Sequence, residues 1–455
     1  MSQKSAGKPV DLDALNPIPM DHRHMSPLNY SMVFWSSTII VQIMVIGLYL
    51  MPPAGVLNFQ QTLVVGLISG TICATFIMLN GDAGIRYGVP FVIQGRSGFG
   101  TKGARIVAFI RSIPAICWNG IGTWIGALSM REVTMQLFGI GDVWVYFFML
   151  LVLQSILAYK GVRSIKWFDS AMSIVIFAML AYFFYVVFAT GKVDFSIAIS
   201  FKGSWSLPFI AGIMAATANY TTIMLNASDI IRHIKPKNET SMMRSNAFAN
   251  YFGIVPPWMF MFISGIIIAL ATGASDPIKG LVQLSPHPVF GIILLLFIIL
   301  AQITSNLSLN ILPPALAFQD IFKIGWKTGV ITVAVLSIGV CPWVLFTSDY
   351  FFLFQNIYSC FLGPALGVMI ADYFIIRKKK LNLKVLYDDN GIYTYKGGFS
   401  IAGMVSLVAG AVMSFMFLSY SWLVGFPFTI ILYTIIKRSG LEKEFEQREK
   451  EIENA

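Results

Sequence analysis

The run PVFGIILLLFIILAQITSNLSLNILPP, residues 288–314, decides the fold class. Its first half is almost entirely apolar, and a helix needs about 20 predominantly apolar residues to cross a bilayer. Its second half carries six polar side chains in nine residues, from Gln302 to Asn310. A polar side chain at membrane depth costs a few kcal/mol unless it finds a partner or borders a wet cavity. The segment therefore predicts a transmembrane helix beside a polar cavity.

The whole chain repeats this apolar pattern. Of its 455 residues, 56% are hydrophobic and 12% are charged, whereas a soluble domain carries about a quarter charged residues. We therefore predict an all-α membrane protein with twelve transmembrane helices in one bundle, residues 30–437, between polar tails at 1–29 and 438–455. The predicted spans lie near residues 30–51, 61–80, 104–130, 143–160, 168–190, 207–229, 249–273, 288–314, 328–346, 349–375, 399–418 and 420–437.

The basic residues indicate the orientation of this bundle. With Arg111 assigned to a span, 27 Lys and Arg residues lie in the tails and the even-numbered loops, and 4 lie in the odd-numbered loops. The positive-inside rule then places both termini in the cytoplasm, as expected for a multi-pass protein of the plasma membrane. The formal charge of +10 is spread over short loops, so we expect no nucleic-acid partner. The polar N-terminus lacks the pattern of a cleaved signal peptide.

Enzymatic and cofactor motifs are missing from the sequence. All four cysteines fall in apolar runs, and no cluster of His and Cys has metal-ligand spacing. The glycines near residues 81–103 lack the Gly-Lys-Ser/Thr of a phosphate-binding loop. No catalytic triad converges in one layer of the bundle. We therefore expect a protein that is not an enzyme and that has no cofactor beyond a possible coupling ion.

Four spans contain polar clusters, namely the first, third, sixth and eighth. Spans one and six, and spans three and eight, are five apart, which is the relation expected of two five-helix halves in inverted repeat. The halves would cover about residues 30–190 and 207–375, with two extra helices at 399–437. In that architecture the first helix of each half is broken at mid-membrane. Residues 217–222 could supply one break, but no Pro or Gly between Ser36 and Gln42 marks the other. For a single Ser or Thr, helix packing remains the alternative.

The ionisable residues of the polar spans indicate which ion could be coupled to transport. No carboxylate or histidine lies in spans one, three or eight, whereas proton relays normally use such groups. Neutral oxygens suit a hard cation. The sequence therefore favours sodium over protons, with proton coupling left as the alternative.

Several motifs together resemble the nucleobase:cation symporter family one, over about residues 26 to 400. The closest resemblance is to its allantoin, hydantoin and purine permease branch. The motifs are Asn80-Gly-Asp-Ala-Gly-Ile-Arg-Tyr-Gly-Val-Pro-Phe91, Arg96-Ser-Gly-Phe-Gly100, Trp118-Asn-Gly120, Asn226-Ala-Ser-Asp229, Thr304-Ser-Asn306 with Asn310, Cys341-Pro-Trp343, Leu362-Gly-Pro364 and Asp372-Tyr-Phe374.

This resemblance implies a LeuT-like fold of ten core helices plus two, alternating access, and a planar heterocycle held at mid-membrane. Trp118 and Tyr220 match the positions that sandwich the substrate ring, and Asn310 matches a position that hydrogen bonds to it. For a sodium site, Ala301, Thr304 and Ser305 match ligand positions. Thr38 and Val41 correspond less closely to first-helix carbonyl ligands. Further candidate substrate residues are Gln42, Gly122, Asn219 and Thr222.

The sequence departs from the hydantoin carriers of this family at two positions. Gly122 stands where they have a glutamine, and Tyr220 stands where they have a second tryptophan. A mismatched buried polar group costs about 1–3 kcal/mol. We therefore expect a substrate other than hydantoin, and Gly122 predicts room for a bulkier ring.

The predicted function is uptake of a small planar nitrogen heterocycle, such as a nucleobase, allantoin or a related purine or pyrimidine compound, by cation symport. Its partners would be that substrate and the lipid bilayer, and we expect a monomer. The alternatives are a carrier of the same fold for an amino acid or a vitamin-like compound, and a membrane enzyme or a channel.

Overall fold

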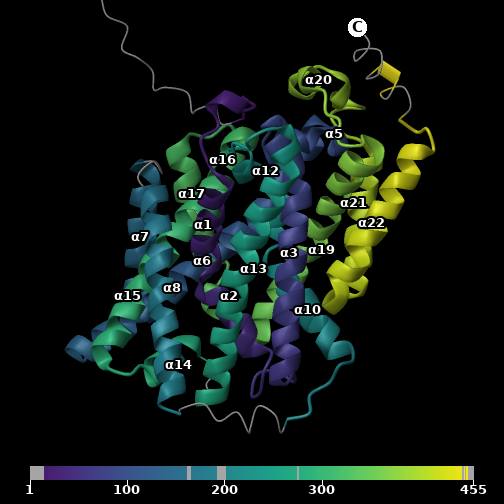
Figure 1. Ribbon diagram of the computed structural model, residues 1–455. Coiled ribbons are helices and arrows are strands. Elements are labelled where there is room, and N and C mark those ends of the chain that lie inside the picture. The colour runs from purple at the N-terminus through teal and green to yellow at the C-terminus, as the bar shows by residue number, and fades with distance from the viewer. Residues whose placement is uncertain are drawn as a thin grey trace, which may run out of the picture.

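The computed structural model describes residues 15–160, 165–191, 201–273 and 276–442, together with 445, 447 and 448. These residues form helices and connecting loops and contain no β-strand (Figure 1). Residues 1–14 of the predicted N-terminal tail and residues 443, 444, 446 and 449–455 of the predicted C-terminal tail lie outside them. The all-α prediction is confirmed.

The helices coincide with the predicted spans. Uninterrupted spans are α3 (Phe59–Tyr87), α6 (Thr101–Phe138), α7 (Val143–Lys160), α8 (Ile165–Ala189), α13 (Glu239–Thr272), α17 (Trp326–Gly339), α19 (Ser348–Ile370), α21 (Ile401–Met416) and α22 (Ser421–Arg438). Interrupted spans are α1 (Pro27–Thr38) with α2 (Val41–Tyr49), α10 (Leu207–Asn219) with α11 (Thr221–Leu225) and α12 (Ser228–Ile231), and α15 (Pro288–Ser305) with the π-helix η3 (Asn306–Ile311) and α16 (Leu312–Phe322). Short elements are η2 (Met20–His22), α4 (Phe91–Gln94), α5 (Arg96–Phe99), α14 (Pro277–Leu284), α18 (Pro342–Leu345), the π-helix η4 (Ala371–Ile376), α20 (Leu383–Tyr387), η5 (Ile392–Thr394) and η6 (Leu418–Tyr420).

Length and composition identify the membrane crossings. Within the described residues, six helical segments are long and apolar enough to cross a membrane, and the bent pair of α1 and α2 can make a seventh. Five shorter apolar helices coincide with the other predicted spans. The chain is therefore a multi-pass membrane protein, while the count of twelve crossings stays a prediction.

The first span is broken, although its sequence contains no Pro or Gly at this point. The axes of α1 and α2 meet at 58°. Ile40 has an extended backbone, with φ −131° and ψ 149°, and Ile39 lies outside the helical region with ψ 69°. Two adjacent β-branched residues tolerate extended backbone well, so this pair can interrupt the helix without a conventional breaker. The sequence alone did not reveal this break.

The sixth span is broken where the polar cluster predicted it. Helix α10 ends at Asn219, and α11 begins at Thr221. Asn and Thr side chains offer local hydrogen bonds that compete with the helical ladder, which weakens the helix at this position. The predicted break within residues 217–222 is confirmed.

The packing of the spans follows the predicted offset of five. Helix α13 packs along α1, α2 and α3, and α3 also contacts α10, α11 and α12. This group, which we call the bundle, therefore joins spans one, two, six and seven. Helices α6, α7, α15, α16 and α17 form the second group, which we call the scaffold, and join spans three, four, eight and nine. Each group thus pairs spans that are five apart.

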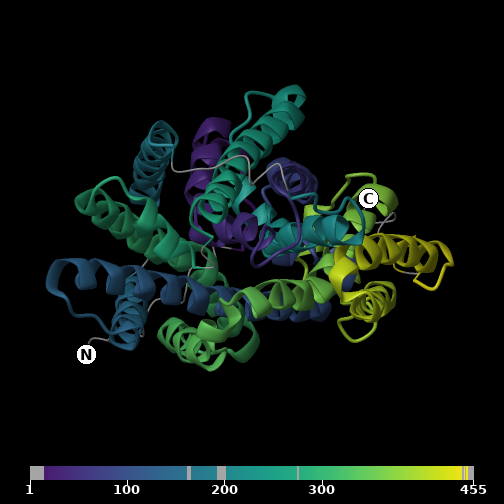
Figure 2. The same cartoon turned by 90° about the horizontal axis from the view of Figure 1, so that it is seen from below.

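The last two helices lie at one edge of the molecule. Helices α21 and α22 pack against each other and against α19, and the end-on view shows them at the periphery (Figure 2). Glu442 accepts hydrogen bonds from the backbone N–H of Ile401 (2.6 Å) and from Ser400 Oγ (3.0 Å) at the start of α21. Its carboxylate also lies 2.6 Å from Lys437 Nζ, and both side chains are buried. This buried pair fastens the end of α22 to the start of α21.

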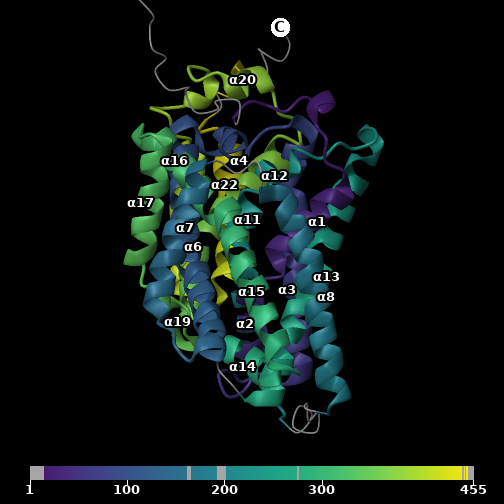
Figure 3. The ribbon, with the colours of Figure 1, turned by 90° about the vertical axis from the view of Figure 1, so that its left-hand side faces the viewer.

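The connecting elements distinguish the two ends of the molecule. Helix α20 lies at one end and α14 at the other (Figures 1 and 3). The N-terminal segment belongs to the α20 end, since Tyr387 Oη donates to Leu15 O at 2.8 Å. The end of α22 lies at this end as well (Figure 1).

Candidate functional site

The breaks in spans one and six lie side by side. Tyr220, between α10 and α11, has its hydroxyl 2.7 Å from Thr38 Oγ1 at the end of α1. The same hydroxyl donates to Ser37 O at 3.2 Å. The structure thus brings together Thr38 and Tyr220, which were predicted for different parts of the site. Because helix ends leave backbone groups without helical partners, this junction concentrates free donors and acceptors inside the membrane.

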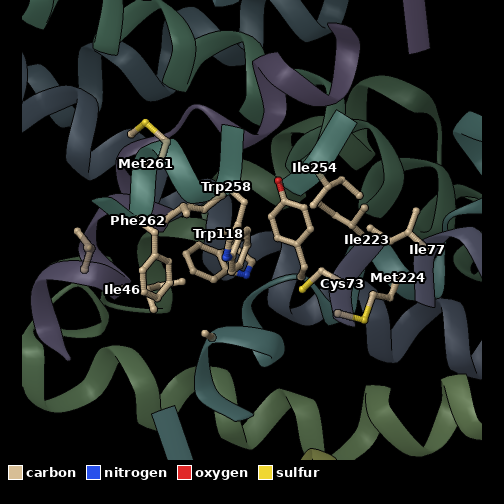
Figure 4. Packing of buried hydrophobic residues seen from close by; sticks show 14 of the residues in the cluster. Ile46, Cys73, Ile77, Trp118, Ile223, Met224, Ile254, Trp258, Met261 and Phe262 are labelled. Atoms are coloured by element: carbon tan, nitrogen blue, oxygen red, sulfur yellow. The ribbon is translucent and has the colours of Figure 1, made fainter. Parts of the chain in front are cut away.

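Trp118 of α6 forms an aromatic wall together with Phe351, Phe354 and Tyr358 of α19. Its side chain is buried, and its ring makes edge contacts with Phe354 (5.4 Å between centroids) and Phe351 (5.9 Å). Phe354 in turn contacts the ring of Tyr358 at 5.0 Å. Figure 4 shows Trp118 within the buried cluster that also holds Trp258. These rings form an apolar surface suited to the face of a flat ligand.

Tyr358 connects that wall to the break in span six. Its hydroxyl donates to Ala218 O (2.8 Å) and lies 3.2 Å from Asn219 O, two carbonyls at the end of α10. The adjacent Asn219 side chain is buried, and its Nδ2 has no hydrogen-bond partner among the residues that the structure describes. A buried donor without a partner costs about 1–3 kcal/mol. Asn219 therefore offers an unused amide donor beside the aromatic wall.

The predicted sandwich of Trp118 and Tyr220 is not formed. Tyr220 makes an edge contact with Trp258 (5.1 Å), whereas the ring contacts of Trp118 are with α19. Both rings are buried in the same hydrophobic cluster, with 7% and 1% of their area exposed. Neither ring lines either of the two cavities described in the molecule. In this conformation both rings are covered by protein. Thr222, another predicted substrate residue, is buried in the first turn of α11.

The space expected beside Gly122 is filled by Asn306. A Cβ atom placed on Gly122 would lie 2.6 Å from Asn306 Oδ1 and 2.8 Å from its Nδ2. Asn306 Nδ2 donates to Asn119 O (3.1 Å) and to Gln154 Oε1 (3.0 Å). Asn310, the predicted substrate ligand, donates to Asn306 Oδ1 at 2.9 Å. The idea that Gly122 leaves room for a bulkier ring is therefore wrong, and this glycine instead allows Asn306 to position Asn310.

Gln42 is paired with Gln302 across the two helix groups. Gln42 Nε2 donates to Gln302 Oε1 at 2.8 Å, and Gln302 Nε2 donates to Gln42 Oε1 at 3.3 Å. Both side chains are buried. Gln42 belongs to α2 of the bundle and Gln302 to α15 of the scaffold, so this amide pair joins the elements that flank the first break.

A small cavity separates the break in span one from α15. Val41 and Ala301, two of the predicted cation ligands, line it, and its volume of about 10 Å³ is close to that needed for a single water molecule. Thr304 Oγ1 donates to Ala301 O at 3.2 Å, while the side-chain oxygen of Thr38 is engaged by Tyr220. Thr304 and Ser305 are both buried on α15. The negative end of the α1 dipole points toward this junction, which favours a cation there.

Arg111 is a polar residue that the sequence reasoning assigned to a span without a role. It is buried in α6, and within the described part of the chain its Nε and Nη1 have no hydrogen-bond partner. Asp229 at the end of span six stabilises its charge electrostatically. A lone arginine between the apolar Ile110 and Ile113 was the available signal. Tyr358 was also missed, because a tyrosine in an apolar span carries no distinctive signal.

Comparison with known proteins assigns the family. The sequence profile of a family described as "Permease for cytosine/purines, uracil, thiamine, allantoin" matches residues 17–436. The chain belongs to this permease family. The resemblance inferred from the motifs is confirmed, and the family consists of transporters, as expected in place of an enzyme.

The permease has relatives with known names at low identity. It is 26% identical to the hydantoin permease of Microbacterium maritypicum over 382 residues, which covers 81% of this chain and 78% of that protein. It is also 26% identical to the allantoin permease of Bacillus subtilis over 420 residues, with 83% of each chain covered.

Solved structures of similar shape confirm the fold of the permease. Mhp1, a nucleobase-cation-symport-1 family transporter, in a closed conformation with bromovinylhydantoin bound, gives a TM-score of 0.82 at 24% identity, with 93% of this chain and 94% of that chain covered. Its inward-facing conformation gives 0.85 at 23% identity, with 97% and 96% covered. The predicted LeuT-like helical fold is therefore confirmed.

Proposed function

We propose that this permease imports a small planar nitrogen heterocycle by cation symport. The observation that carries the proposal is the unpartnered Nδ2 of Asn219 beside the Trp118–Phe354–Tyr358 wall. A flat, polar ring would contact the wall with its face and accept a hydrogen bond from Asn219 at its edge. Movement of Tyr220 or of the α19 wall would open the space that the ring needs.

The relatives suggest the substrate class. Their names include hydantoin, allantoin and purine-uracil permeases, and hydantoin, allantoin and uracil each carry ring or ureide amide groups. We favour a nucleobase or allantoin over hydantoin, because Gly122 and Tyr220 alter the polar groups that the site presents. Asn310, Gln42 and Thr222 are the further groups that we place at this substrate.

We propose sodium as the coupling ion. Its ligands would be the carbonyls of Thr38, Val41 and Ala301 with the hydroxyls of Thr304 and Ser305, because oxygen donors suit this cation. One monovalent cation crossing about 100 mV releases about 2.3 kcal/mol, and a tenfold gradient adds about 1.4 kcal/mol. One ion per substrate would therefore support accumulation of about several hundredfold.

We further propose a monomer in the plasma membrane, with the α20 end in the cytoplasm. The basic run 377–380 lies between α19 and α20, and the excess of Lys and Arg at this end supports that orientation.

Substitution of Trp118 tests the proposal. Binding of uracil, hypoxanthine, allantoin and hydantoin to the purified protein would be measured in sodium and in choline. We expect W118A to weaken heterocycle binding at least tenfold, and W124A, on the same helix but packed against Trp144 and Trp343, to retain it. Unchanged binding in W118A would refute the role of the wall. Binding that is equal in choline and sodium would refute sodium coupling, and binding of amino acids alone would favour the other carrier class.

A further inference from the structure

The Gln42–Gln302 pair has the geometry of a cyclic amide dimer. Each side-chain amide donates one N–H to the oxygen of the other, at 2.8 Å and 3.3 Å. Only 3% and 1% of the two residues is exposed, so water does not compete for these groups. Each amide therefore has its hydrogen-bonding edge satisfied by the other while the site is closed.

The pair lies beside the small cavity at the break in span one. Gln302 lines the cavity that also touches Val41 and Ala301, and Gln42 directly follows Val41 in the chain. The pair also spans the boundary between the bundle and the scaffold, which move relative to each other in alternating access. Opening of this boundary would separate the amides and expose the edge of Gln42.

The edge of Gln302 has the same chemistry as the edge of a lactam. A ring amide with adjacent N–H and C=O groups presents one donor and one acceptor side by side, as a primary amide does. Building on the proposed function, we infer that the side-chain amide of Gln302 occupies the hydrogen-bonding position on Gln42 that the substrate takes when it binds. It pairs with Gln42 in the empty permease, and the lactam edge of the substrate takes its place on Gln42 during binding.

This exchange makes Gln302 a competitor of the substrate. In wild type, binding must first break the amide pair. In Q302L the amide of Gln42 has lost its partner before binding, and a buried unpaired amide raises the free energy of the empty state. The substrate relieves that penalty. We therefore expect Q302L to bind a lactam substrate about tenfold more tightly, equivalent to about 1.4 kcal/mol, and to melt at a lower temperature when empty.

A double-mutant cycle tests this role. Uracil, allantoin and 1,3-dimethyluracil, which lacks both ring N–H groups, would be titrated into wild type, Q302L, Q42L and the double variant at fixed sodium. We expect Q42L to bind uracil at least tenfold more weakly. The gain from Q302L should vanish in the Q42L background and for 1,3-dimethyluracil. The double variant buries no unpaired amide, so it can be measured even if Q302L folds poorly. It should bind uracil no more tightly than Q42L does.

A matched control separates this role from loss of any buried amide. Gln154 on α7 is another buried glutamine, which pairs with Asn306, and Q154L should lower stability without tightening binding. Weaker or unchanged uracil binding in Q302L would overturn the inference, as would an equal gain in Q154L. If wild type binds no heterocycle, or if W118A binds heterocycles as wild type does, the proposed function itself fails. If wild type binds heterocycles but Q302L does not bind them more tightly, only the proposed role of Gln302 is rejected.

Discussion

Substitution of Gly122 by alanine tests how the scaffold positions Asn310. The new methyl carbon would lie 2.6 Å from Asn306 Oδ1, 2.8 Å from Nδ2 and 3.0 Å from Cγ. All three distances are too short for van der Waals contact, so the Asn306 side chain must move. It would then lose its hydrogen bonds to Asn119 O and Gln154 and release Asn310.

The size of the effect follows from these contacts. Interhelical hydrogen bonds in membranes contribute about 0.6–2 kcal/mol each, and overpacking costs about 1–3 kcal/mol. We expect G122A to lose about 2–4 kcal/mol of stability and to bind substrate about tenfold more weakly. Gly126, one turn further along α6, is the matched control, because its Cβ would meet the flexible end of Leu150 at 3.0 Å and would lie at an ordinary van der Waals distance of 3.9 Å from Gln302 Cβ.

Thermal unfolding in detergent and equilibrium binding of uracil would measure both quantities in G122A and G126A. N306A removes the clashing atoms, so adding G122A to N306A should cost little more than N306A alone. The reasoning is refuted if G122A and G126A behave alike, or if G122A costs as much in the N306A background as in wild type.

Four further substitutions have defined outcomes. T304V and S305A should each raise the sodium concentration for half-maximal substrate binding at least tenfold while leaving binding at saturating sodium near wild type, and a sodium dependence unchanged from wild type in both variants would exclude these hydroxyls from the ion site. Y358F leaves Ala218 O and Asn219 O without their hydroxyl donor, so it should cost about 1–3 kcal/mol of stability, and an unchanged melting temperature would contradict this. E442A breaks a buried ion pair and should cost about 3–5 kcal/mol, whereas D21A, in the exposed pair with His22, should cost less than about 1 kcal/mol. Similar melting temperatures for E442A and D21A would show that the buried pair does not stabilise the protein.

The sequence was sufficient to predict the helices and one of the two breaks. Long apolar runs locate the spans because membrane thickness sets their length. The break at Tyr220 was visible because polar residues surround it. The break at Ile39 and Ile40 was not, since a β-branched apolar pair is compatible with a membrane helix as well as with extended backbone. Conventional breakers are thus not necessary, and they are not sufficient either, because Pro114 lies within the uninterrupted helix α6 and Pro256 and Pro257 lie within α13.

Side-chain partners within the site were harder to predict. The sequence placed Gln42 and Gln302 in polar clusters, but they are 260 positions apart and their pairing depends on how two helix groups meet. The absence of a side chain at Gly122 suggested space, because the sequence does not show which neighbour fills it. A role for Arg111 could not be predicted, because Asp229, the acid that interacts with its charge, is distant in the sequence and close only in the fold. The positions of the helices in the sequence follow from local composition, whereas the contacts between side chains in the site follow from tertiary packing.

The π-helix η3 has a consequence for how span eight tolerates change in chain length. A π-turn contains one residue more than the α-helical turn it replaces, and such turns behave as single-residue insertions in a regular helix. Deleting one residue within Asn306–Ile311 would convert the turn to α-helix and preserve the register of Pro313 with everything after it. A deletion one turn earlier, in the regular part of α15, would instead change the register of Thr304 and Ser305 relative to the first turns of this helix. Among close homologues, gaps in this span are therefore expected to fall at residues 306–311.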